Sequence, residues 1–63
     1  MDEVKDGITI AAKLITQSNK AWFLNCEGDR EWFPKAYCIF DEGKEELTAP
    51  RWILKSKFPD EDY

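Results

Sequence analysis

The side chains that could carry out chemistry in this sequence are two cysteines and thirteen carboxylates, because the chain contains no histidine. The lack of an imidazole excludes Ser-His-Asp and Cys-His catalysis and removes the commonest metal ligand. Cys26 and Cys38 do not have the Cys-x-x-Cys spacing of a zinc site. Glu27 or Glu31, near Trp32, could act as a general acid only if burial raised its pKa. Since the sequence holds no nucleophile motif and no phosphate-binding loop, we expect no enzyme, no metal and no cofactor.

Aromatic and basic residues are the other candidates for a functional surface. Aromatic rings on a strand, flanked by cations, form a platform on which nucleobases stack, at about 1–3 kcal/mol per base. The same rings could instead form the core, since each buries roughly 150–250 Å². Neighbours on a strand face opposite sides, so one of Trp22 and Phe23, and one of Trp32 and Phe33, should lie outside the core. The binding candidates are Trp32, Phe33, Lys35, Tyr37, Arg51 and Trp52.

Length and composition predict one small domain. The 63 residues are 43% hydrophobic, which suits a packed core and not a disordered chain. A domain of this size buries only about 60% of the surface that its unfolded chain exposes. We expect a single domain over residues 1–63, with an ordered core over residues 7–58 and acidic tails at residues 1–6 and 59–63.

The net charge of −4 arises from acidic blocks. Residues 1–6 carry a charge of −2, and residues 41–46 and 60–62 each carry −3. These blocks could dock on a basic patch of a partner or mimic nucleic acid, or they could simply be a solvated loop and tails. No segment has the pattern of a signal peptide or of a membrane-spanning helix. We therefore expect a cytoplasmic protein with two reduced thiols and no membrane contact.

The first half of the chain is expected to form a hairpin. Residues 8–16 alternate apolar and polar side chains, which predicts one half-buried strand that begins after Gly7. The polar segment 17–20 contains good turn formers, and residues 21–26 are rich in the aromatic side chains that favour strands.

A second hairpin should follow directly. Residues 31–33 predict its second strand, and the connection should use Gly28 and Asp29 for its special backbone angles. Pro34 cannot donate a ladder hydrogen bond, so it should end this strand, lie on an edge or turn the chain. Residues 37–40 predict a further strand.

One or two helical turns are expected over residues 51–57, with Pro50 as the first helical residue. A helix this short is stable only if it is buried against other elements. We therefore expect the ring of Trp52 to pack on the sheet as a lid, with Ile53 or Leu54 beside it.

These elements predict a mostly β fold with one short C-terminal helix. The favoured architecture is a small SH3-like antiparallel barrel or a curled sheet of four or five strands, since closure removes exposed edges. The alternative is an open meander of three or four strands with the helix packed across one face.

Two short motifs carry a resemblance to a protein family. Trp32-Phe33-Pro34-Lys35 follows a hairpin with a glycine turn, and Pro50-Arg51-Trp52 follows residues 47–49, which are expected to form a short extended segment. Over residues 8–58 this pattern resembles small accessory proteins encoded by bacteriophages, to which no biochemical role is assigned. The sequence departs from that pattern at Ala36, where serine is common, and in lacking a glycine after the helix. The resemblance implies a viral origin and leaves the function open.

The residues and the resemblance together lead to one functional expectation. The chain should be a non-enzymatic protein-binding module, a phage accessory protein that modulates a host or phage protein through an exposed aromatic patch with an acidic rim. It should be a monomer or a weak homodimer. The alternative is a single-stranded nucleic-acid binder that uses Trp32, Lys35, Arg51 and Trp52. A net charge of −4 disfavours that alternative, because affinity for phosphate comes mainly from cations.

Overall fold

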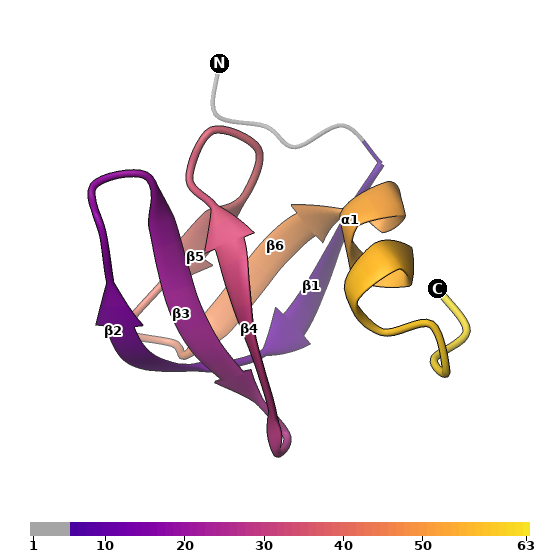
Figure 1. The fold of residues 1–63 in the computed structure, drawn as a ribbon, viewed down its shortest axis with the longest axis horizontal. Coiled ribbons are helices and arrows are strands. Elements are labelled where there is room, and N and C mark those ends of the chain that lie inside the picture. Colours follow the sequence, from indigo (N-terminus) through magenta and orange to yellow (C-terminus); the bar gives the residue numbers. More distant parts are fainter. Residues whose placement is uncertain (1–5) are drawn as a thin grey trace.

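The chain forms two small antiparallel sheets and one short helix (Figure 1), and the computed structural model describes residues 6–63. One sheet has the strand order β1-β6-β5 and the other has the order β2-β3-β4. The mostly β fold with a C-terminal helix is therefore confirmed. The bounds are β1 Gly7–Ala11, β2 Lys13–Gln17, β3 Ala21–Cys26, β4 Asp29–Pro34, β5 Ile39–Asp41, β6 Glu46–Pro50 and α1 Arg51–Lys57.

The predicted single strand over residues 8–16 is wrong, because the chain bends at Ala12. Ala12 is buried between β1 and β2, and its N–H donates to the carbonyl oxygen of Glu45 at 2.9 Å. That bond lies outside the ladders, so the chain leaves β6 after Ala11 and pairs with β3 from Lys13 onward. The bend lets one stretch of chain serve both sheets, and so curls the structure around a common core.

The hairpin between β3 and β4 is confirmed, and so is the role of Gly28 in its turn, but the other turn residue is Glu27 and not Asp29 as predicted. Glu27 and Gly28 have φ values of 55° and 97°, and Asp29 already pairs with Cys26 in the ladder. Positive φ at both central residues is the mark of the type I′ turn, whose twist matches that of the strands. The side-chain Oδ1 of Asn25 accepts the Gly28 N–H at 2.7 Å and supports the turn. This two-residue turn sets the register of the whole hairpin.

The chain between β4 and β5 is a turn up to Tyr37, so the prediction of a strand over residues 37–40 is partly wrong. The N–H groups of Tyr37 and Cys38 both donate to the carbonyl oxygen of Pro34, at 3.2 and 3.1 Å. Pro34 ends β4, as predicted, and β5 begins only at Ile39. Among the described residues β4 and β5 do not pair, so the curled sheets do not close into a complete barrel.

The core lies between the two sheets and is covered on one side by α1. Ile53 and Leu54 are the buried residues of the helix, whereas Trp52 is 62% exposed. The expectation that the Trp52 ring forms the lid is therefore wrong. Pro50 stands one position before the helix with an extended backbone, as the N-cap and not as the first helical residue. The largest fully buried side chains are Leu24, Phe33, Leu47 and Leu54.

The chain after the helix folds back onto the core. The Glu61 N–H donates to the carbonyl oxygen of Phe58 at 3.1 Å, and the Tyr63 ring lies 6.4 Å from the ring of buried Phe58. The segment predicted as an acidic C-terminal tail thus packs its last aromatic residue against the core. Of the predicted N-terminal tail, residues 1–5 lie outside the described residues.

Candidate functional site

The six predicted binding residues do not form one continuous site. Phe33 is fully buried in the core, so its prediction as a contact residue is wrong. Its neighbour Trp32 is 45% exposed, which confirms that one of this adjacent pair faces outward. The alternation of side chains along β4 causes the difference, because Phe33 faces the interior with Leu24 whereas Trp32 faces away from it.

Tyr37 and Trp52 form an exposed aromatic pair at the point where α1 begins. Their ring centroids are 5.9 Å apart and the ring planes meet at 69°, the edge-to-face arrangement that aromatic pairs prefer. Tyr37 is 58% exposed and Trp52 is 62% exposed. The turn after β4 and the first turn of α1 therefore bring together two predicted site residues that are distant in sequence.

Arg51 ties the start of the helix to the start of β1. Its Nε lies 3.2 Å from Oδ2 of Asp6, and its backbone N–H donates to the Asp6 carbonyl oxygen, also at 3.2 Å. Both side chains are largely exposed, so the ion pair contributes about 0–1 kcal/mol to stability. The ion pair holds the guanidinium of Arg51, the residue before Trp52 in the sequence, at Asp6.

Lys35 has a different set of contacts. Its Nζ donates to Oε1 of Gln17 at 2.7 Å and lies 5.4 Å from the centre of the Trp22 ring, a cation–π distance. Trp22 in turn lies against Phe40, with 5.9 Å between ring centroids. No ring contact between Lys35 and either Tyr37 or Trp52 is found within residues 6–63. Lys35 therefore belongs with the partly buried Trp22 and not with the exposed pair.

A second exposed aromatic pair lies on the outer face of the β2-β3-β4 sheet. Trp32 and Phe23 are direct cross-strand partners, with centroids 4.9 Å apart and ring planes inclined by 31°. Lys13, Asn25 and Arg30 form the next row across the same three strands. Lys13 was missed by sequence reasoning. It lies in one row with Arg30 because both residues pair with Asn25, so its position depends on the registers of two hairpins, which only the turn residues could have indicated.

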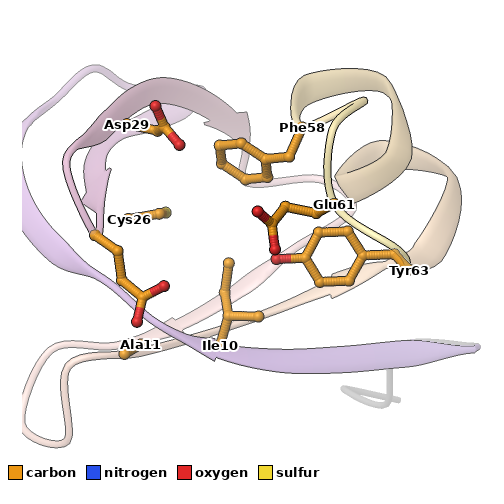
Figure 2. A pocket seen from close by; sticks show the side chains of 8 residues that line it. Ile10, Ala11, Cys26, Asp29, Phe58, Glu61 and Tyr63 are labelled. Carbon is orange, nitrogen blue, oxygen red and sulfur yellow. The ribbon is translucent and has the colours of Figure 1, made fainter.

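A third feature is a pocket of about 320 Å³ between β1, the end of the β3–β4 hairpin and the C-terminal segment (Figure 2). Ile10, Cys26 and Phe58 give it an apolar part. Figure 2 shows the carboxylate of Glu61 and the hydroxyl of Tyr63 directed into the pocket, opposite Asp29. The lining also includes Ala11 and Glu27, and none of its residues is basic.

Burial and, after it, the nearby carboxylates make this pocket unsuited to thiol chemistry. Burial, followed by the charges of Asp29, Glu27 and Glu31, raises the pKa of the Cys26 thiol to about 11. Burial also raises the pKa of Cys38 to about 11, against a small opposing effect of Lys57. Both cysteines are free, and both stay protonated at neutral pH because the reactive thiolate forms only near the pKa. What the pocket can do is accept a cation or a hydrogen-bond donor.

Burial, then the charge of Glu61, also raises the pKa of the Tyr63 hydroxyl, so the phenol remains a neutral donor in this pocket. Within residues 6–63 there is no group of three or more side chains placed to hold a metal ion, and no helix long and apolar enough to cross a membrane. No family model, curated protein or solved structure matches the chain.

Proposed function

We propose that this chain is a small, non-enzymatic protein-binding module whose contact surface is centred on Tyr37 and Trp52. The observation that carries the proposal is that a 63-residue chain leaves its two most exposed large rings together in solvent. Burying one large apolar side chain would stabilise the fold by about 1.5–3 kcal/mol. Tyr37 and Trp52 do not contribute this stabilisation. Tryptophan and tyrosine are among the residue types most enriched in the hot spots of protein interfaces.

The residues around the pair suit an interface. Arg51, the third residue type enriched in hot spots, precedes Trp52 and is oriented by Asp6. Lys55 and Ser56 are exposed on α1, three and four positions after Trp52, which places them on the same face of the helix. The surface thus has an aromatic centre with a polar and charged border.

The acidic rim of the sequence-based hypothesis is reduced in this proposal to the single carboxylate of Asp6. Residues 42–45, which include Glu42 and Glu45, form the turn between β5 and β6, and the carbonyl oxygen of Glu45 accepts the Ala12 N–H at the opposite end of β1 from Gly7. The aromatic pair, by contrast, lies beside Pro50, which pairs with Gly7. We therefore assign partner recognition to the aromatic centre and not to the acidic blocks.

The class and origin of the module belong to the same proposal. The continuous strand order β5-β6-β1, passing through the bend at Ala12 into β2-β3-β4, supports an SH3-like barrel that is open between β4 and β5. The resemblance in the Trp32–Lys35 and Pro50–Trp52 motifs supports a phage accessory protein that acts on a host or phage protein in the cytoplasm. Protonated, buried thiols support a non-enzymatic role.

The test is a comparison of proteins captured from bacterial lysate by the immobilised chain and by two variants. Trp52→Ala removes one ring of the proposed surface, and Trp32→Ala removes an exposed tryptophan on another surface. We expect at least one protein to be retained by the wild type and by Trp32→Ala but lost with Trp52→Ala. Binding should then be reproduced with that protein in purified form.

The result that contradicts the proposal is a set of captured proteins that does not change with Trp52→Ala, or direct binding of the purified partner that this substitution weakens less than tenfold. Truncation of a central interface residue costs at least about 2 kcal/mol, which corresponds to roughly a thirtyfold loss of affinity. Far-UV circular dichroism of both variants establishes that they remain folded.

A further inference from the structure

The outward face of the β2-β3-β4 sheet is a separate surface with its own chemistry. In the ladder, Lys13 pairs with Asn25 and Asn25 with Arg30, while Thr16 pairs with Phe23 and Phe23 with Trp32. Directly paired residues in an antiparallel sheet share a face, so these are two adjacent rows of one surface. Leu24 and Phe33, at intervening positions of β3 and β4, face the opposite way and are buried, whereas Ile15 lies at a bulge in β2 and is 47% exposed.

The row of aromatic residues presents a flat ring to solvent. The Trp32 and Phe23 rings are inclined by only 31° with centroids 4.9 Å apart, which is close to an offset stack. Phe23 is partly buried, and Trp32 remains 45% exposed. Figure 1 shows these three strands at one side of the molecule, with α1 on the other side of the view and no described element drawn across them. The indole therefore has the Phe23 ring against it from the neighbouring strand and keeps nearly half of its surface exposed.

The charged strand positions on this face are both cations, although the whole chain is acidic. Within the described strands β2, β3 and β4, the outward positions are Lys13, Thr16, Ala21, Phe23, Asn25, Arg30, Trp32 and Pro34, with exposed Ile15 at the bulge in β2, and none carries a carboxylate. Carboxylates lie at the ends of the cationic row, where Glu27 lines a hollow with Lys13, and Asp60 and Glu61 line another with Arg30. Two other acidic residues of the hairpin are directed away from the row. Asp29 lines the pocket on the inner side, and Glu31 lies 3.9 Å from Nζ of Lys57 on the helix. The net charge of −4 therefore does not describe the potential at this surface.

We propose that this outward face binds single-stranded nucleic acid, with an unpaired base stacked on Trp32 and with Lys13 and Arg30 contacting phosphates. An exposed ring beside a row of cations on a sheet is the arrangement by which proteins bind single strands without reading their sequence. Bases in a duplex are already stacked on one another, so duplex of the same length cannot use the indole. An acidic peptide would satisfy the two cations but would leave the ring without a planar partner.

This inference is independent of the proposed protein-binding surface, which uses Trp52 and lies on other elements. Two cations predict a weak salt dependence, because each phosphate neutralised on a single strand contributes about −0.7 to the slope of log K against log salt. Two contacts give a slope of about −1.4. The slope is a direct count of the contacts that Lys13 and Arg30 make.

The experiment measures the fluorescence anisotropy of fluorescein-labelled oligothymidine as the full chain is added at several salt concentrations. We expect saturable binding with a slope near −1.4, and weaker binding of a labelled duplex. Trp32→Ala should lower the affinity by about fivefold or more, the loss expected for one stacked base. Trp32→Phe should retain much of the affinity, because it keeps a ring at this position.

Substitutions of the cations supply the matched controls. Lys13→Ala and Arg30→Ala should each make the slope shallower by about 0.7, whereas Lys55→Ala, on the helix, should leave it unchanged. Trp52→Ala should bind oligothymidine as the wild type does. All of these side chains are largely exposed, and far-UV circular dichroism verifies that each variant is folded.

Three results would each overturn the inference. The first is the absence of saturable oligothymidine binding at low salt. The second is equal affinity of the wild type and folded Trp32→Ala. The third is competition by an oligoglutamate peptide as strong as that by unlabelled oligothymidine, which would make an acidic protein the occupant of this face.

Discussion

Replacement of Trp52 by alanine is the substitution whose outcome depends most on the tertiary structure. From sequence this residue is expected to act as the core lid, and its loss should then cost about 3–5 kcal/mol. In the structure it is 62% exposed, so a little over a third of its surface is covered. For a side chain of roughly 250 Å² this is about 90 Å², and at about 25 cal/mol per Å² the upper limit is ~2 kcal/mol.

Two further effects reduce that limit. Alanine keeps the Cβ contacts of the original side chain, and it has a higher helix propensity than tryptophan at an exposed helical position. We therefore expect Trp52→Ala to destabilise the protein by about 1 kcal/mol, which lowers the midpoint of thermal unfolding by roughly 4–8 °C for a domain of this size. Leu54→Ala, two residues along the same helix, removes a fully buried side chain and should cost about 2–5 kcal/mol.

The assay is urea denaturation followed by far-UV circular dichroism, because tryptophan emission would change with the substitution itself. A domain of 63 residues has a stability of roughly 3–9 kcal/mol, so Leu54→Ala should remove a large share of the free energy of unfolding, whereas Trp52→Ala should remove a small one. Equal destabilisation by the two substitutions would refute this reasoning. It would mean that the Trp52 ring is part of the core, and it would remove the basis for the Tyr37–Trp52 contact surface.

Two other predictions concern the thiols and the hairpin turn. The pKa values of Cys26 and Cys38 rise from 9.0 to about 11 in the folded protein, so between these pH values the folded protein keeps protons that the unfolded chain releases. The free energy of unfolding should therefore be unaffected by the thiols below pH 8 and should fall between pH 9 and 11. A double Cys→Ala variant should show a shallower decline in pH-dependent urea melts, and an identical decline would contradict the assignment. Gly28→Ala should cost about 1–3 kcal/mol through strain alone, because φ is +97° and no atom lies within 4 Å of the added Cβ. Gly43→Ala, where φ is not in the left-handed region, is the control and should change thermal stability by less than half as much.

Local pattern was sufficient to predict most of the elements. Aromatic content along residues 21–26 and 31–33 indicated two strands, which the structure confirms, and the alternation of side chains along a strand predicted that Trp32 and Phe33 face opposite sides. This works because the side-chain period of a strand is a property of the backbone itself and needs no information from distant residues. Pro34 ended its strand for a similarly local reason, since it has no N–H to donate.

Which side of an element becomes the core was not decided locally. Trp52, Ile53 and Leu54 are three consecutive large residues on a helix, about 100° apart around its axis, so they cannot all face the sheet. Because α1 begins directly after β6, the end of that strand fixes how the helix is rotated about its axis. In this orientation Ile53 and Leu54 face the core, and Trp52 lies beside Tyr37. Composition favoured the largest ring for the core, and the packing geometry selected the two aliphatic residues.

The candidate surfaces show the same division. Composition alone determines that the chain is short and acidic, with a net charge of −4 and no histidine, and these facts bound the chemistry available to it. The bend at Ala12 and the two-residue turn at Glu27 and Gly28 then decide where the charges lie. The turn sets the register that places Arg30 opposite Asn25 on one face and directs Asp29 toward the pocket on the other, and the β2–β3 pairing adds Lys13 to the same row as Arg30. Register depends on pairing between segments distant in sequence, so only the tertiary structure could separate a cationic face from an acidic pocket within a single acidic chain.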